Sequence, residues 1–169
     1  WFVGFLPEKR PLLDRIWVEL SQQFANYARG KGIEVLIIGL ASYFVFALFS
    51  LSYAALLGLL VGLSVIVPYI GAALVTLPVV VVAYFQFGVT PDFYWVIGAY
   101  LVIQVLDGNV LVPLLFSEAV NLHPVAIVIA VLFFGGVWGL WGVFFAIPLA
   151  TMVNALLSAW PARDAWSAE

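Results

Sequence analysis

Three acidic side chains in an otherwise apolar stretch are the residues with the clearest potential for chemistry. Between Glu34 and Arg163 the only charged residues are Asp92, Asp107 and Glu118. Because a charged side chain at the centre of a bilayer costs about 2.5–3.5 kcal/mol, each carboxylate there must be hydrated, neutralised or close to a surface. Acids of this kind are typical of ion and proton sites in membrane proteins.

Asp107 has polar neighbours whose spacing suits a binding site. Gln104 precedes it by three residues, which places both side chains on one face of a helix, and Asn109 follows shortly after it. We expect these side chains to line a cavity between helices. The alternative is a helix end at the membrane edge, with Gly108 as its cap. The apolar pieces on either side are too short to cross a membrane alone, and this favours a broken or re-entrant helix.

A second polar patch contains Glu118, Asn121 and His123, with Pro113 and Pro124 on either side. Glu118 or His123 could exchange protons, because histidine is the side chain that titrates near neutral pH. An ordinary aqueous connection has the same composition, and we favour that interpretation.

The sequence contains no motif of a known catalytic or metal site. There is no His-Glu-x-x-His, no Gly-x-Ser-x-Gly and no phosphate-binding loop, and the chain has one histidine and no cysteine. Neither Asp107 nor His123 has a second catalytic group at a suitable spacing. We therefore expect no enzymatic activity, no metal ion and no cofactor.

The composition places these residues in a membrane. Hydrophobic residues make up 66% of the chain and charged residues 9%, and the mean hydropathy is +1.17, whereas soluble domains carry about 25% charged residues. Continuously apolar segments must satisfy their backbone hydrogen bonds internally, as helices do in lipid. The prediction is an all-α integral membrane bundle. All Lys and Arg residues lie within positions 9–31 or at 163, so no nucleic-acid-binding face is expected.

The residues before the apolar region form a separate part. An amphipathic helix is predicted over 11–31, lying on the membrane surface or packed on an upstream domain. Gly30 and Gly32 are predicted to break it, so that residues 1–32 precede a transmembrane region at 33–160 and a C-terminal tail at 161–169. The basic residues place the first part on the cytoplasmic side.

Prolines, glycines and polar residues divide the transmembrane region into segments. The clearest boundaries are a break at Pro68–Gly71, because proline lacks a backbone donor, and a loop at Gly88–Asp92, in which Asp92 is a solvated turn residue. The aromatic residues Phe93, Tyr94 and Trp95 that follow are typical of a membrane interface. The predicted apolar segments are 33–50, 52–67, 72–87, 94–106, 110–116, 124–134 and 140–157. Counting complete and partial crossings gives roughly five to seven.

Small residues mark the expected helix contacts. Gly58 with Gly62, and Gly135 with Gly139, have the four-residue spacing that lets helix backbones approach, and Gly142 follows. We expect these five glycines to lie in helix–helix interfaces.

The order of three motifs resembles the autoinducer-2 exporter-like family and, within it, the PerM-type permeases. The first motif is Val67-Pro68-Tyr69-Ile70-Gly71, after an apolar helix. The second runs from Gln104 to Asn109 and is followed by Val112-Pro113. The third is Asn121-Leu122-His123-Pro124, which leads to Gly135-Gly136, Gly139, Gly142 and Ala146-Ile147-Pro148-Leu149. The resemblance begins near Phe5 and corresponds to the C-terminal half of the family.

The resemblance implies a transporter that crosses the bacterial inner membrane several times. Family members have eight spans with a soluble insertion after the third, so residues 1–32 would include the end of that insertion. Members are described as exporters of autoinducer-2 or as sodium or proton antiporters, and pentamers are reported. This implies a homo-oligomer in the lipid bilayer. The family often has Glu before Gly-Asn or Asn-Asn. This chain has Asp107 at that position, and its side chain is shorter than that of Glu by one methylene group.

These observations together predict a secondary carrier. Unwound backbone and polar side chains at the two predicted breaks would form a site between helices, and movement of the breaks would alternate access. The predicted site residues are Pro68, Tyr69, Gly71, Gln104, Asp107, Asn109 and Pro113, with Asp107, Glu118 or His123 as the group that couples an ion or proton. Two alternatives stay open: a membrane scaffold whose glycine faces serve oligomerisation, and a channel.

Overall fold

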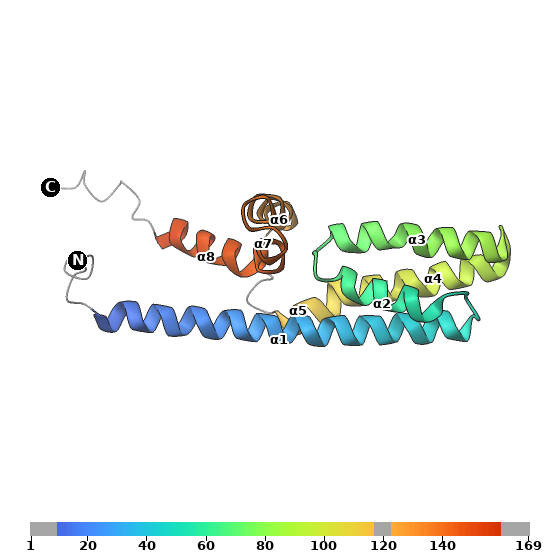
Figure 1. Cartoon of the computed structure of the whole chain (residues 1–169), viewed down its shortest axis with the longest axis horizontal. Helices are drawn as coiled ribbons and strands as arrows, with labels where there is room; N and C mark the ends of the chain where they lie inside the picture. Colours follow the sequence, from blue (N-terminus) through green and yellow to red (C-terminus); the bar gives the residue numbers. More distant parts are fainter. Residues whose placement is uncertain (1–9, 117–122, 160–169) are drawn as a thin grey trace.

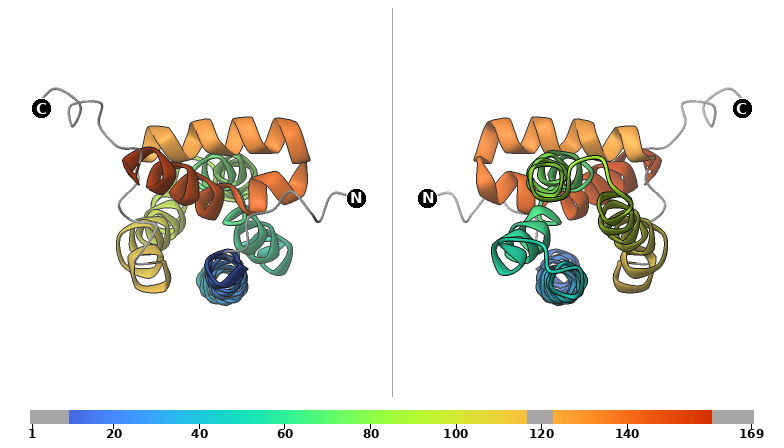
Figure 2. Two further views of the ribbon diagram at one scale, coloured as in Figure 1. Left: turned by 90° about the vertical axis from the view of Figure 1, so that its left-hand side faces the viewer. Right: turned by 90° about the vertical axis from the view of Figure 1, so that its right-hand side faces the viewer.

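A four-helix bundle forms the larger part of the molecule. The computed structural model describes residues 10–116 and 123–159, and each regular element in these ranges is a helix. In Figure 1 the first four helices run alternately in opposite directions along one axis, and the end-on views of Figure 2 show them around a common centre. They are α1 (Arg10–Leu48), α2 (Ala54–Ser64), α3 (Ile70–Phe87) and α4 (Pro91–Leu106).

The C-terminal helices are arranged differently. A π-helical turn, η2 (Asp107–Leu111), joins α4 to the short helix α5 (Val112–Leu115). The remaining helices are α6 (Pro124–Trp138), α7 (Leu140–Phe144) and α8 (Ala146–Ala159). Helices α6 and α7 form a hairpin that lies across the axis of the bundle (Figures 1 and 2).

The expected all-α membrane fold is confirmed. Three helical stretches among the described residues are long and apolar enough to cross a membrane: Phe24–Leu48, Ile70–Phe87 and Pro91–Leu115. Helices α2 and α6 are apolar but shorter. Large apolar side chains also cover the outside of the bundle, and Leu48 and Phe85 are 82% and 83% exposed. Such a surface suits contact with lipid or with further helices.

Helix α1 overturns one prediction, the break at Gly30 and Gly32. The helix runs straight through both residues (Figure 1). Glycine costs a helix only about 1 kcal/mol relative to alanine and keeps its backbone donor, so packing can override it. Gly30 has such packing, because a Cβ atom there would lie 2.8 Å from the Phe116 ring. The amphipathic and apolar stretches are therefore one helix that does not bend at this point, and the domain division at residue 32 stays a prediction.

The predicted break at Pro68 is confirmed. Helix α2 ends at Ser64 and α3 begins at Ile70, with Tyr69 in a positive-φ conformation (61°). Gly71 is required at the start of α3, because a side chain there would collide with the Ser64 carbonyl. The missing donor of proline and the close approach at glycine together turn the chain between two helices.

The loop before α4 is also present but shorter than predicted. Gly88 has φ of 62° and ends α3, and Pro91 is already the first residue of α4. Asp92 therefore lies in the first helical turn, where a carboxylate interacts favourably with the helix dipole. Tyr94 and Trp95 are exposed, and their place at a membrane interface stays a prediction.

The predicted break at Gln104–Pro113 is wrong, because the helix continues through it. The Val112 N–H donates to the carbonyl of Asp107, five residues earlier, which is the π-helical pattern. This wider turn directly precedes Pro113, which has no backbone donor. The chain thus accommodates the proline without unwinding, and Pro91–Leu115 becomes one span-length helix.

Candidate functional site

A buried ion pair lies on the inner side of α1. Lys31 Nζ is 2.7 Å from Glu34 Oε2, and the two residues are only 3% and 1% exposed. Their spacing of three residues places both side chains on one helix face. A buried charge is tolerated only when it is paired, so each residue depends on the other for its stability in the interior.

Aromatic rings close one side of this pair. Lys31 Nζ lies 5.2 Å from the centre of the Phe116 ring, within the range of a cation–π interaction. The Tyr27 ring lies 5.1 Å from that of Phe116. Within the described part of the chain, the buried Tyr27 hydroxyl has no hydrogen-bond partner. The rings of Phe116 and Tyr27 therefore cover one side of the ion pair, and in the described structure the Tyr27 hydroxyl is free to bind a further group.

Asp107 brings a second carboxylate to the ion pair. It is the first residue of the π turn, and it is 9% exposed. Its Oδ1 atom is buried without a hydrogen-bond partner among residues 10–116 and 123–159. The charge of Lys31 acts on the Asp107 carboxyl, and the charge of Asp107 acts in turn on Glu34. We call Lys31, Glu34 and Asp107 the charged cluster.

The charged cluster carries an excess of negative charge when all three groups are ionised. Among the described residues one lysine faces two carboxylates. Since an unpaired carboxylate is costly in a membrane, a proton or a bound cation would stabilise this arrangement. No group of three or more His, Cys, Asp or Glu residues in the described ranges could hold a metal ion. Because of its excess of negative charge, such a cluster could take up a proton or a cation.

The predicted neighbours of Asp107 separate into two sets. Gln104 is half-buried, and its Nε2 atom is buried without a partner in the described ranges. Asn109 is exposed, and its amide donates to the Val105 carbonyl at 2.8 Å. Pro113 is half-buried in α5. Gln104 thus shares the interior with Asp107, whereas Asn109 faces outward.

The break at Pro68 lies at the same end of the bundle as the charged cluster. Val67 and Ile70, on either side of Pro68 and Tyr69, pack against the core that contains Tyr27 and Phe116. Pro68 is half-buried and Tyr69 is exposed. The structure therefore brings the break close to the aromatic residues that lie beside the ion pair.

The second predicted patch does not join this cluster within the described structure. His123 is exposed and caps α6, with its Nδ1 atom accepting a hydrogen bond from the Val125 N–H at 3.3 Å. Glu118 lies outside the described residues. Their suggested roles in ion coupling stay predictions.

Most of the five glycines lie at close helix contacts. A Cβ at Gly58 would be 2.8 Å from the Tyr43 Cβ, and one at Gly62 would be 2.7 Å from the Val35 carbonyl oxygen. Gly142 packs on the Phe134 carbonyl, and a Cβ at Gly135 would be 2.7 Å from Val143. Gly139 differs, because its φ of 62° makes the turn between α6 and α7.

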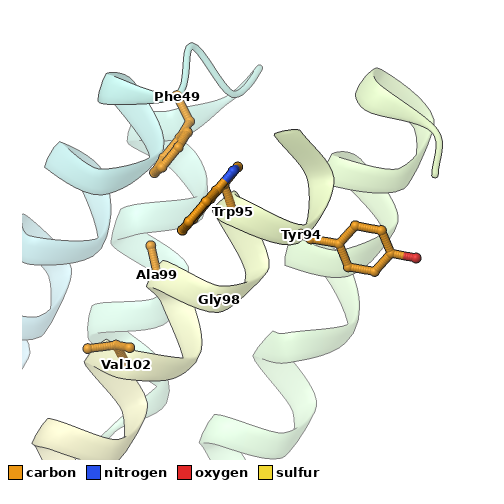
Figure 3. Close-up of a pocket in the computed structure, with 6 residues that line it drawn as sticks. All are labelled: Phe49, Tyr94, Trp95, Gly98, Ala99 and Val102. Atoms are coloured by element: carbon orange, nitrogen blue, oxygen red, sulfur yellow. The ribbon is translucent and has the colours of Figure 1, made fainter. Parts of the chain in front are cut away.

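A surface groove on α4 is a poor candidate for the site. It has a volume of about 500 Å³ and is lined by Phe49, Tyr94, Trp95, Gly98, Ala99 and Val102. Figure 3 shows Phe49 and Trp95 at one end, while the Tyr94 ring points away from the other side chains. The groove is apolar and excludes the charged cluster, so it suits contact with a lipid chain.

Sequence reasoning missed Lys31 and Glu34 as site residues. The sequence predicts Lys31 in an amphipathic surface helix, beside a break that the described helix does not contain. The available signal was the three-residue spacing of opposite charges at the start of an apolar stretch, which can form a pair on one helix face. Their partner Asp107 is far away in the sequence, so the complete cluster follows only from the fold.

A bundle of membrane helices with a buried cluster of opposite charges is typical of membrane transport proteins. A family model described as "AI-2E family transporter" matches residues 1–162. The chain belongs to this family, as the sequence motifs indicated.

Similar proteins have transport-related names. "Putative permease PerM" of Escherichia coli K12 is 56% identical over 156 residues, which cover 92% of this chain and 44% of that protein. "Putative transport protein YueF" of Bacillus subtilis is 30% identical over 141 residues, covering 83% of this chain and 38% of that protein. The chain thus spans less than half the length of these relatives. No solved structure matches it significantly.

Proposed function

We propose that the protein is an ion-coupled carrier that exports small molecules across the bacterial inner membrane, which it crosses several times. The observation that carries this proposal is the buried Asp107 carboxyl, which has one oxygen unpartnered in the described structure and is acted on by the charge of Lys31 in the buried Lys31–Glu34 pair. The permease and transport names of the relatives support the same class. In this proposal the protein acts as a transporter and not as an enzyme.

The charged cluster suggests how ion binding would drive movement. When a proton or cation binds to Asp107, the charge of this carboxylate is neutralised. Lys31 then pairs with Glu34 alone. Release of the ion lets Asp107 compete with Glu34 for Lys31, which pulls η2 towards α1. The π turn and the break at Pro68 are the irregular places where the helices can adjust, as broken helices do in other carriers.

A second candidate function is sodium or proton antiport, with the ion itself as the cargo. It is favoured by the presence of two carboxylates for one lysine in the described cluster. A non-transporting scaffold is the remaining alternative. The family resemblance supports a homo-oligomer, a pentamer, in either case, and the tight glycine contacts described above lie within one chain.

Transport by the full-length protein distinguishes these functions. Membrane vesicles with the protein or with empty vector would be tested for uptake of autoinducer-2, with and without an imposed pH or sodium gradient. The proposal predicts vector-corrected uptake that saturates and that depends on a gradient. Sodium-driven proton flux without uptake would establish the antiporter instead. Vesicles indistinguishable from vector in both assays would contradict transport and favour the scaffold.

A further inference from the structure

A bonded pair of hydroxyl groups on α3 and α4 and a third, buried hydroxyl on α1 lie in the same bundle, and we call the three the hydroxyl cluster. Ser42 lies on α1, Thr76 on α3 and Tyr100 on α4. The Thr76 hydroxyl donates to the Ala72 carbonyl at 2.7 Å, and the Thr76 and Tyr100 oxygens are 2.9 Å apart. Because Thr76 has only one proton to donate, Tyr100 is the donor in the second bond. The Tyr100 oxygen can then still accept a hydrogen bond.

Ser42 is the unsatisfied member of this hydroxyl cluster. It is 0% exposed, and its hydroxyl has no partner in the described ranges. Ile38 and Phe46, one helical turn before and after it, belong to the same core as Tyr100. The Phe46 and Tyr100 rings are 5.9 Å apart. Ser42 therefore faces the same interior as Tyr100, with a free donor and acceptor.

The hydroxyl cluster and the charged cluster lie on opposite sides of the middle of the bundle. Along α1, eight residues separate Glu34 from Ser42, or about 12 Å at the helical rise. Along α4, seven residues separate Tyr100 from Asp107, or about 10 Å. Buried Ile38 and Ile103 lie between them. In the span-length stretches Phe24–Leu48 and Pro91–Leu115, the polar groups thus occupy both halves, with buried apolar side chains at the centre.

We infer that the hydroxyl cluster is the second station of a proton path that leads to Asp107, with Ile38 and Ile103 as its closed constriction. This inference rests on the proposed carrier function. A hydronium ion gives its proton to the Ser42 oxygen, and that hydroxyl passes its own proton to a water molecule that is held by donating a hydrogen bond to the Tyr100 oxygen. The last water in the chain protonates the Asp107 carboxylate. Each intermediate oxygen gains and loses one proton, so only hydronium and Asp107 change.

The charged and titratable groups around the endpoint fit this role. From α1, Tyr27, Lys31 and Glu34 lie next to the site, and Asp107 comes from η2. A proton that reaches Asp107 relieves the excess of negative charge described above. The hydroxyl cluster is neutral, so it can conduct protons without holding them, which is what a path through the apolar half of the bundle requires.

Proton-coupled transport in liposomes tests this path. The full-length protein would be reconstituted with an internal pH dye, and uptake of autoinducer-2 would be measured together with proton flux in H₂O and D₂O. The variants are Tyr100→Phe and Ser42→Ala, which remove single hydroxyl groups. Tyr84→Phe is the matched control, because Tyr84 is 51% exposed on the outside of α3. Thermal melting of each variant checks that it is folded.

The path predicts that both variants slow proton flux by about fivefold or more. Tyr100→Phe loses a hydrogen bond of about 1 kcal/mol to the water of the path, which corresponds to that factor, and Ser42→Ala loses the oxygen that receives the proton. It also predicts a solvent isotope effect that is altered in the variants and unchanged in Tyr84→Phe. If folded Tyr100→Phe and Ser42→Ala keep the proton flux of the wild type, the path is overturned and the carrier function is not. The same holds if the wild-type protein takes up autoinducer-2 without any proton flux. A wild-type protein with neither activity would overturn the carrier function and, with it, this inference.

Discussion

Helix α1 has two contacts of opposite character. Its contact with α2 is made at glycines, because Gly39, Gly58 and Gly62 allow the two helix backbones to approach closely. On the side of α4 and α5 it carries Lys31 and Glu34, near polar atoms that have no partner in the described structure. The first contact is close-packed and cannot shift without collision. In the second contact, side chains can change their hydrogen-bond and ion-pair partners without a large change in packing. We therefore expect movement on this side of α1.

The largest effect is expected from removing the positive charge of the cluster. Lys31→Met leaves Glu34 and Asp107 buried without a cation among the described residues. Loss of one partner from a buried pair costs about 3–5 kcal/mol. We expect the free energy of unfolding in detergent to fall by that amount, measured by denaturant titration.

The double variant Lys31→Met with Glu34→Gln is the control for this prediction. It removes the pair as a whole, so most of the lost stability should return. If Lys31→Met alone unfolds at the same denaturant concentration as the wild type, the charges do not stabilise this contact of α1. The difference between the two contacts of α1 would then be contradicted.

The glycine contact should respond to added volume and not to charge. Gly62→Ala would place a Cβ 2.7 Å from the Val35 carbonyl oxygen and 2.9 Å from the Gly39 Cα, both backbone atoms. Overpacking of this kind costs about 1–3 kcal/mol. The same denaturant titration measures it. A Gly62→Ala protein as stable as wild type would show that α1 and α2 can move apart freely.

The smallest effect is expected at Gly32, and its sign is opposite. A Cβ at this position meets no atom within 4 Å in the described structure, and the residue is exposed in mid-helix. Gly32→Ala should therefore stabilise the protein, by up to about 1 kcal/mol, through helix propensity alone. A loss of stability in thermal melting would indicate that α1 bends or is covered here.

Features set by local chemistry could be predicted from the sequence. The turn at Pro68 and Gly71 and the loop at Gly88 follow from a missing donor and from glycine conformations. The break at Gly30 failed because a glycine permits a helix that packing favours, and Phe116, distant in sequence, supplies that packing. The break before Pro113 failed because a π turn can absorb a proline without unwinding.

The candidate site was only partly predictable for the same reason. Asp107 and Gln104 stood out as polar residues in an apolar stretch. Lys31 and Glu34 looked like the polar edge of a surface helix, because their burial depends on the packing of α1 against α4 and α5 and on the ring of Phe116. Ser42 and Tyr100 carry no sequence signal, since single hydroxyl groups are common in membrane helices.

The most direct test of the transport site compares two identical chemical changes. Asp107→Asn neutralises the buried carboxylate, and Asp92→Asn neutralises the exposed one at the start of α4. At matched membrane expression, the account predicts that gradient-driven uptake of autoinducer-2 falls to the vector level in Asp107→Asn and stays at the wild-type level in Asp92→Asn. Wild-type uptake by Asp107→Asn would contradict the account, because the transport site would then lie elsewhere.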